Sequence, residues 1–159
     1  MITSYKTIIK ATEGLYKEKG SKFIAYAFPV LNEEEVKAEL AELRKKHYDA
    51  RHHAYAYIIG TDKSSWRAND DGEPSGSSGK PIHGQLLSYD LTNTLIVVVR
   101  YFGGTKLGIP GLINAYRSAA KEAIEAAEIV EKKIEDIYEL SFEYPDMNTV
   151  MKILKDEDI

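Results

Sequence analysis

Residues 94–111, Thr-Leu-Ile-Val-Val-Val-Arg-Tyr-Phe-Gly-Gly-Thr-Lys-Leu-Gly-Ile-Pro-Gly, contain the change of pattern that decides the fold. Residues 94–102 are rich in β-branched side chains and apolar on both faces, which predicts a central strand covered on both sides or packed under helices. A pair of glycines ends this strand. From 110 to 128 apolar residues recur at helical spacing, with Leu112 and Tyr116 in the stripe. The stretch therefore predicts a buried strand, a glycine-rich turn and a long helix in direct succession.

The rest of the chain predicts an α+β domain. Strands are expected at 5–9, 15–19, 21–30, 54–60 and 138–144, and helices at 33–46, 81–90 and 147–155. A turn is expected at Glu13–Gly14, and Asn32 with Glu35 forms a capping box before the first helix. Residues 61–80, rich in Gly, Pro, Asp and Ser, predict a long loop. This order favours helices layered on one face of a mixed sheet.

The composition is that of a globular domain. The chain has 159 residues, of which 43% are apolar and 29% charged. It has no cysteine, which excludes a disulfide scaffold, a cysteine nucleophile, an iron–sulfur cluster and a zinc site with thiolate ligands. No apolar run approaches the roughly 20 residues of a bilayer span, and the N-terminus has no apolar signal core. We therefore expect a cytoplasmic protein without membrane contact.

The charges are distributed unevenly along the chain. Residues 44–117 carry 10 basic and 6 acidic side chains and all 4 histidines, whereas residues 118–159 carry 5 basic and 12 acidic side chains. A locally basic segment in an acidic protein indicates a site for an anionic partner. The alternative is that acidic helices simply solvate the C-terminal third. A sequence pI of 5.6 argues against non-specific coating of nucleic acid.

The glycine-rich turn is the first candidate site. Glycines allow a close backbone approach, the start of the following helix presents unpaired N–H groups, and Arg100 and Lys106 add positive charge. Together these features favour binding of a phosphate or a carboxylate. The segment matches neither the P-loop nor the dinucleotide-binding fingerprint. A tight strand–helix corner without a ligand is the alternative interpretation.

The acidic loop at 69–81 is the second candidate. Its carboxylates do not have the spacing of a calcium loop, and a magnesium site on Asp70, Asp71 and Glu73 competes with the commoner role of Asp and Ser in turns and caps. His52 and His53 are adjacent on a predicted strand, so they point to opposite faces and cannot easily share a metal. A single His with one of these aspartates could act as an acid–base pair, but no nucleophile elbow is present. We predict no catalytic site, metal or cofactor.

Four segments, taken in order, resemble the YigZ/IMPACT family. They are KGSKFIAYAFPV (19–30), RHHAYAY (51–57), NDDGEPSGSSGKP (69–81) and VRYFGGTKLGIPGLINAYRSAA (99–120). The resemblance implies that residues 1–130 form a two-layer α/β sandwich like the second domain of small-subunit ribosomal protein S-five. It also implies that bacterial members continue into a ferredoxin-like domain, of which residues 131–159 would be the first strand and helix. The resemblance further implies that eukaryotic members regulate translation under amino-acid stress. For the bacterial branch, it implies a fold and a positively charged groove that suggest nucleic-acid or ribosome contact.

The sequence thus predicts a non-catalytic binding module linked to translation, with RNA or a ribosome-associated factor as partner. The predicted anion- or nucleic-acid-binding residues are Arg51, His52, Arg67, Lys80, Arg100, Gly103, Gly104, Lys106, Gly108 and Arg117. The predicted recognition loop comprises Asp70, Asp71, Gly72, Glu73, Pro74, Ser75 and Gly76. One alternative is a protein-interaction regulator anchored by Tyr and Trp. The other is a magnesium-dependent hydrolase using Asp70, Asp71, His52 or His53.

Overall fold

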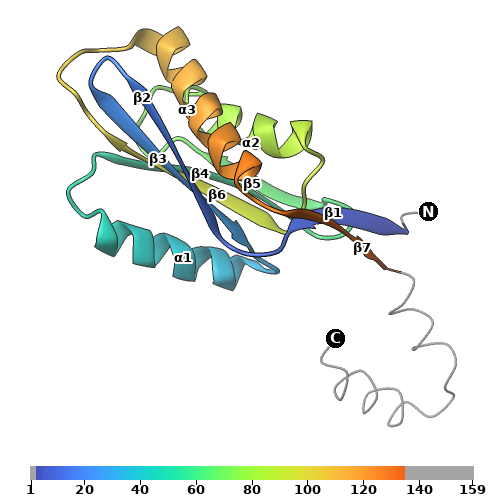
Figure 1. Cartoon of the computed structure of the whole chain (residues 1–159). Helices are drawn as coiled ribbons and strands as arrows, with labels where there is room; N and C mark the ends of the chain where they lie inside the picture. The colour runs from blue at the N-terminus through green and yellow to red at the C-terminus, as the bar shows by residue number, and fades with distance from the viewer. Residues whose placement is uncertain (1–2, 135–159) are drawn as a thin grey trace, which may run out of the picture.

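A computed structural model describes residues 3–134 of the chain (Figure 1). The strands are β1 (Ser4–Ile8), β2 (Thr12–Glu18), β3 (Ser21–Pro29), β4 (His52–Ile59), β5 (Ser65–Asn69), β6 (Thr94–Tyr101) and β7 (Ile129–Lys133). The helices are α1 (Glu33–Lys46), α2 (Gly79–Ser88) and α3 (Gly108–Glu125). The strand predicted at 138–144 and the helix predicted at 147–155 lie outside the described residues. The predicted domain boundary at residue 130 falls inside β7.

The centre of the fold is a five-stranded sheet with the order β2-β3-β6-β4-β5. β6 occupies the middle, and its residues from Leu95 to Val99 are 0% exposed, as its uniformly apolar sequence predicted. All four strand pairs of this sheet are antiparallel, so the expectation of a mixed sheet was wrong. β1 and β7 form a separate antiparallel pair at the end of the sheet opposite to the β6–α3 connection (Figure 1). The α+β class is confirmed, whereas the likeness to a ribosomal protein domain stays a prediction.

Helices cover both faces of the sheet, not one face as expected. α1 packs Val36 and Leu43 against the face that carries Tyr55 and Val97, while α2 and α3 pack against the opposite face (Figure 1). The reason lies in the inner strands. Alternate residues of β4 and β6 are apolar on both sides, so each side needs a cover. The fold has three layers in consequence.

Glycine and alanine residues let α3 approach the sheet closely. A Cβ on Gly14 would lie 2.4 Å from the backbone nitrogen of Ala123 in α3, so only glycine fits there. The turn predicted at Glu13–Gly14 was wrong, because both residues lie inside β2 and pair with Tyr26 and Ala25 of β3. This glycine serves a contact between elements and not a reversal of the chain.

Two local predictions differ in outcome. The first half of the capping box is confirmed, since the Asn32 Oδ1 accepts the Glu35 N–H at 2.9 Å, whereas the Glu35 Oε1 accepts the N–H of Leu31 at 2.6 Å instead of that of Asn32. The loop predicted at 61–80 was wrong in part, because it contains β5, a short edge strand whose residues are all at least partly exposed. An edge strand with little apolar character leaves no clear period-two signal. Within residues 3–134, every helix is too short or too polar to serve as a membrane span.

Candidate functional site

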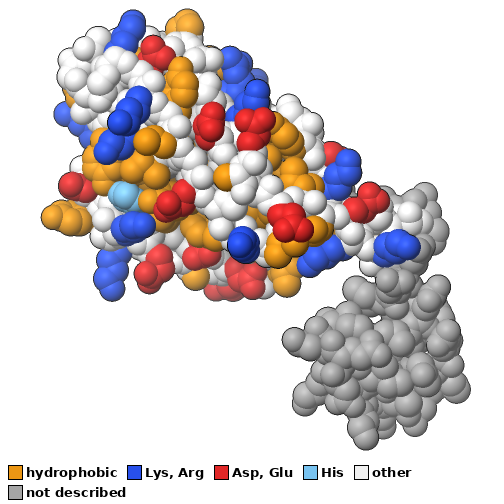
Figure 2. All heavy atoms as spheres, viewed as in Figure 1, with side chains coloured by type: hydrophobic (Ala, Val, Ile, Leu, Met, Phe, Trp, Pro, Cys, Tyr) orange, Lys and Arg blue, Asp and Glu red, His pale blue; other side chains and the backbone are white. Residues whose placement is uncertain are grey.

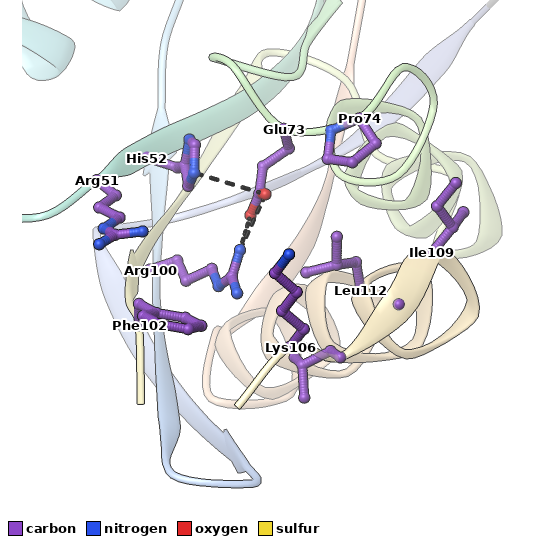
Figure 3. A pocket seen from close by; sticks show the side chains of 11 residues that line it. Arg51, His52, Glu73, Pro74, Arg100, Phe102, Lys106, Ile109 and Leu112 are labelled. Atoms are coloured by element: carbon purple, nitrogen blue, oxygen red, sulfur yellow. Dashed lines mark hydrogen bonds and ion pairs between the residues drawn. The ribbon is translucent and has the colours of Figure 1, made fainter. Parts of the chain in front are cut away.

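A cavity of about 340 Å³ opens at the end of the sheet where β6 leads into α3 (Figure 3). We call it the recess. It is lined by Arg51, His52, Glu73, Pro74, Arg100, Phe102, Lys106, Leu107, Gly108, Ile109 and Leu112. Hydrophobic, basic and histidine side chains lie next to one another on the surface at this end of the molecule (Figure 2). The recess therefore brings the acidic loop after β5 next to the glycine-rich connection after β6.

The floor of the recess is formed by residues that are paired side by side across three strands of the sheet. Arg100 in β6 is paired directly with Phe23 in β3 and with His52 in β4, so these three side chains share the face covered by α3. His53 follows in β4 and points to the other face, where its Nε2 donates to the carbonyl oxygen of His47 at 3.0 Å. Burial lowers the pKa of His53. The two histidines are thus separated by the sheet, as the alternation of a strand predicted.

Glu73 is the centre of a buried polar network above this row. The Arg100 Nη1 donates to both carboxylate oxygens of Glu73, at 2.9 and 2.8 Å (Figure 3). The Tyr116 hydroxyl donates to Oε2 of the same carboxylate. The His52 Nε2 lies 3.6 Å from Oε1. Burial and the hydrogen bond to Glu73 raise the pKa of Tyr116, so its hydroxyl stays a donor. The network fixes the loop onto β6 and α3.

Asp70 organises the acidic loop from within. Its carboxylate accepts the backbone N–H groups of Gly76, Ser78 and Gly79, at 2.9, 3.2 and 2.9 Å, and the Ser78 hydroxyl at 2.9 Å. Burial raises the pKa of Asp70, but these donors outweigh it and the net pKa lies below the usual value. Both oxygens of this carboxylate are therefore engaged by the loop itself.

Asp71 connects the loop to β4 and orients His52. Its carboxylate accepts the His53 N–H at 2.7 Å and lies 3.7 Å from Arg44, while its carbonyl oxygen accepts the His52 Nδ1–H at 2.8 Å. His52 consequently meets Asp71 through the backbone and not as a histidine–carboxylate pair. In the part of the chain that the structure describes, no three His, Asp or Glu side chains gather closely enough to hold a metal ion.

The start of α3 forms the opposite wall. Leu107, Gly108 and Ile109 line the recess, and the N-cap residue Leu107 makes no side-chain capping bond to the helix. Its first N–H groups have no intrahelical acceptor and lie at the positive end of the helix dipole. The Lys106 amine points into the recess towards Glu73 and Arg100 (Figure 3). This wall favours a negatively charged ligand.

Arg51 stands at the mouth of the recess. Its guanidinium lies 4.9 Å from the centre of the Phe102 ring. Among residues 3–134, neither Arg51 nor Lys106 takes part in an ion pair. Arg100, in contrast, is neutralised in part by Glu73. The recess thus offers two unpaired cations and one paired cation.

The structure brings half of the predicted binding residues together. Arg51, His52, Arg100, Lys106 and Gly108 line the recess, whereas Arg67, Lys80, Gly103, Gly104 and Arg117 do not. Of the predicted recognition loop, Glu73 and Pro74 line the recess, and Asp70, Asp71, Gly72, Ser75 and Gly76 do not. The turn glycine Gly103 has a packing role, since a Cβ there would lie 2.0 Å from the Gly20 carbonyl carbon.

The remaining predicted cations lie on three separate elements. Arg67 is in β5 opposite Tyr57, on the α1 side of the sheet, and Lys80 is in the first turn of α2. Arg117 donates to the Asn114 Oδ1 within α3 at 3.0 Å. They do not extend the positive charge of the recess into a continuous track.

Sequence reasoning missed the apolar lining and the partner of Glu73. Leu107, Ile109 and Leu112 supply apolar surface to the recess, and Tyr116 was assigned only to the apolar stripe of its helix. A usable signal was present, because a tyrosine in a stripe of Leu, Ile and Ala needs a buried partner for its hydroxyl.

Comparison with known proteins gives a consistent set of relatives. The model of the Impact N-terminal domain matches residues 19–124, which contain all four segments quoted above. The IMPACT family member YvyE of Bacillus subtilis is 39% identical over 144 residues, covering 91% of this chain and 66% of YvyE. YigZ of Escherichia coli is 35% identical over 138 residues, covering 86% of this chain and 68% of YigZ. The chain thus spans about two thirds of the length of these relatives.

Eukaryotic and structural relatives are also found. A Saccharomyces cerevisiae protein named IMPACT homolog is 34% identical over 115 residues, covering 69% of this chain and 43% of that protein. The crystal structure of a protein described as hypothetical matches with a TM-score of 0.80 and 32% identity, over 84% of this chain and 66% of that one. A further solved chain, the two-domain translational regulator Yih1, has a TM-score of 0.44 at 26% identity, over 77% of this chain and 47% of Yih1.

Proposed function

The chain belongs to the IMPACT family, and from this premise we propose that it is a non-catalytic binding module linked to translation, whose recess contacts RNA. Regulation of translation is what the family resemblance implies for eukaryotic members, and yeast and mouse IMPACT proteins are both similar to this chain. The observation that carries the RNA contact is the pair of unpaired cations, Arg51 and Lys106, beside the uncapped N-terminus of α3. Phosphate oxygens are natural ligands for this combination.

The absence of catalysis is part of the proposal and rests on how the polar side chains are used. The Asp70 carboxylate is held by four donors of its own loop, and Asp71 is held by β4 and Arg44. Glu73 is fixed by Arg100 and Tyr116. Carboxylates engaged in this way position a loop and are poorly placed to move a proton on a substrate.

A pair of charge reversals tests RNA contact at the recess. Arg51→Glu with Lys106→Glu changes two exposed side chains, so the fold should persist. The matched control is Arg67→Glu with Lys80→Glu, which makes the same change in net charge outside the recess. We expect the recess variant to bind a labelled single-stranded RNA more weakly in fluorescence anisotropy. Its plot of log affinity against log salt should become shallower by about 1.4, because each lost phosphate contact removes roughly 0.7.

The control should keep the affinity and salt dependence of the unaltered chain. Equal loss in both variants would mean that RNA senses only the overall charge of the molecule. RNA binding that is unchanged in the recess variant would remove the RNA contact from the proposal.

The apolar lining supports a second candidate, a protein-interaction regulator that does not bind nucleic acid. Phe102 and Ile109 are 37% and 52% exposed at the recess, and such side chains contact a partner's apolar groups. Binding of that kind is insensitive to salt. A complex that survives 1 M salt and is lost in Phe102→Ala, while RNA shows no affinity, would favour this candidate over RNA contact.

A further inference from the structure

Building on the proposed function, we propose that the recess binds one terminal phosphate group, the dianion of a phosphate monoester such as a 5′-phosphate, and not a run of internal phosphodiesters. The proposal depends on three features. They are the unused donors of Arg100, the convergence of other donors on the same cavity, and the limited extent of the positive charge.

Arg100 is nine-tenths buried, yet its guanidinium is only partly used by the protein. Its side chain is 9% exposed, and Nη1 makes both bonds to Glu73. Nε has no hydrogen-bond partner within residues 3–134. Because Glu73 occupies Nη1 and Nε is fully buried, Nη2 is the donor of this guanidinium that remains for a ligand in the recess. A guanidinium N–H bound to a phosphate oxygen forms a strong, charge-assisted hydrogen bond.

Donors from two other directions converge on the recess. The N–H groups of Gly108 and Ile109 belong to the first turn of α3, whose N-cap residue, Leu107, makes no side-chain capping bond. Lys106 points into the cavity from the connection before α3 (Figure 3). A carboxylate or an internal phosphodiester offers two charged or free oxygens, whereas a monoester offers three. Donors from an arginine, a helix N-terminus and a lysine therefore fit the three oxygens of a monoester best.

The limits of the site argue against a longer anionic chain. Arg67, Lys80 and Arg117 lie on β5, α2 and α3 and do not line the recess, so these three predicted cations do not continue its positive charge along a nucleic-acid backbone. The cavity of about 340 Å³ is also larger than a phosphate, and its apolar lining comes from Leu107, Ile109 and Leu112 among others. This lining would contact the organic part of the ester.

Two titrations of the full chain test the proposal. In the first, adenosine 5′-monophosphate, inorganic phosphate and adenosine are added while amide resonances are followed by NMR. The monophosphate and inorganic phosphate should shift the Gly108 and Ile109 amides, and adenosine should not. In the second, a ten-nucleotide RNA with a 5′-phosphate should bind at least tenfold more tightly than the same RNA with a 5′-hydroxyl. Lys106→Gln should abolish this preference, and the matched variant Lys80→Gln should retain it.

The outcomes separate this proposal from the proposed function. If both RNAs bind equally well and the monophosphate shifts no recess amide, the terminal phosphate is overturned while RNA contact stands. If the monophosphate binds and neither RNA does, RNA contact is overturned and the recess is a site for a free phosphate monoester. Adenosine that binds as well as the monophosphate would overturn the role of the phosphate.

Discussion

Arg100 and Glu73 form a buried ion pair on which the shape of the recess depends. Their side chains are 9% and 3% exposed, so both charges have lost most of their hydration. Their mutual attraction offsets this desolvation only because the Tyr116 hydroxyl also donates to the carboxylate. Such a pair adds little net stability over an apolar core of the same volume. Its effect in this chain is positional, since it ties the acidic loop, β6 and α3 together at one point.

Removing one partner of this pair should lower the free energy of unfolding by much more than the intact pair contributes to it. We expect Glu73→Gln to lower the free energy of unfolding by about 3–5 kcal/mol, because Arg100 then stays buried without a counter-ion. The matched control is Glu34→Gln, which removes an exposed pair with Lys37 whose side chains are 86% and 72% exposed. It should cost less than about 1 kcal/mol. Urea unfolding followed by far-UV circular dichroism measures both, and equal losses in the two variants would contradict the prediction.

His47 should make the stability of the fold depend on pH. Burial lowers the pKa of this imidazole below its ordinary value of 6.5, and the ring lies between the Tyr26 and Tyr101 hydroxyls at 2.7 Å from each. The unfolded chain therefore takes up a proton at a higher pH than the folded chain does. The free energy of unfolding should fall as the pH drops from about 6.5 towards the folded pKa.

The variant His47→Gln isolates this contribution. Its free energy of unfolding should change less steeply between pH 7.5 and 5 than that of the unaltered chain, whatever its absolute stability. Some dependence should remain, because burial also lowers the pKa of His53 and His83. Identical slopes in the two proteins would show that His47 does not titrate differently on unfolding.

Among the helices and strands, those features that depend on neighbouring residues in the sequence are predicted correctly. The Asn32–Glu35 capping box gives the start of α1, and the uniformly apolar run from Leu95 to Val99 identifies the central strand. Long-range contacts account for the errors. Gly14 resembles a turn residue, but it is required by the approach of α3, and no neighbour in sequence reveals that. β5 lies at a sheet edge, where exposure on both sides leaves no pattern.

The contact between β2 and α3 can be tested with two glycines. Gly14→Ala places a Cβ 2.4 Å from the Ala123 backbone nitrogen, so the strand and the helix must move apart. We expect a loss of about 1–3 kcal/mol, the usual cost of overpacking. Gly84→Ala is the control, because its Cβ in α2 would have no atom within 4 Å. It should raise stability by about 0.5–1 kcal/mol through helix propensity. Thermal unfolding should therefore show opposite shifts in Tm, and shifts of the same sign would contradict this packing.

On the scale of the whole molecule, the candidate site is harder to predict than the fold. Charge counts and glycines pointed to two segments that meet in the structure, since His52 and Lys106 line one cavity with Glu73. The sequence does not show which polar side chains bind one another. Glu73 is separated in sequence from Arg100 by 27 residues and from Tyr116 by 43, and only the fold brings them into contact. Six lysine and arginine residues were predicted to bind together on the basis of charge alone, but only three of them line the recess. The antiparallel register of β3, β6 and β4 determines which side chains lie together at the base of the recess.

The same arrangement predicts that the molecule opens unevenly. Within residues 3–134, β6 is paired on both sides and buried, whereas β7 pairs only with β1 and has four exposed residues and one partly exposed residue. The β1–β7 ladder should therefore open locally, at a smaller free-energy cost than unfolding of the sheet. In native-state hydrogen exchange, β7 amides should exchange at least about tenfold faster than those of β6. Denaturant should accelerate exchange in β6 strongly and in β7 only weakly, because local opening exposes little surface. Equal protection and equal denaturant dependence would instead mean that the ladder and the sheet unfold as one cooperative unit.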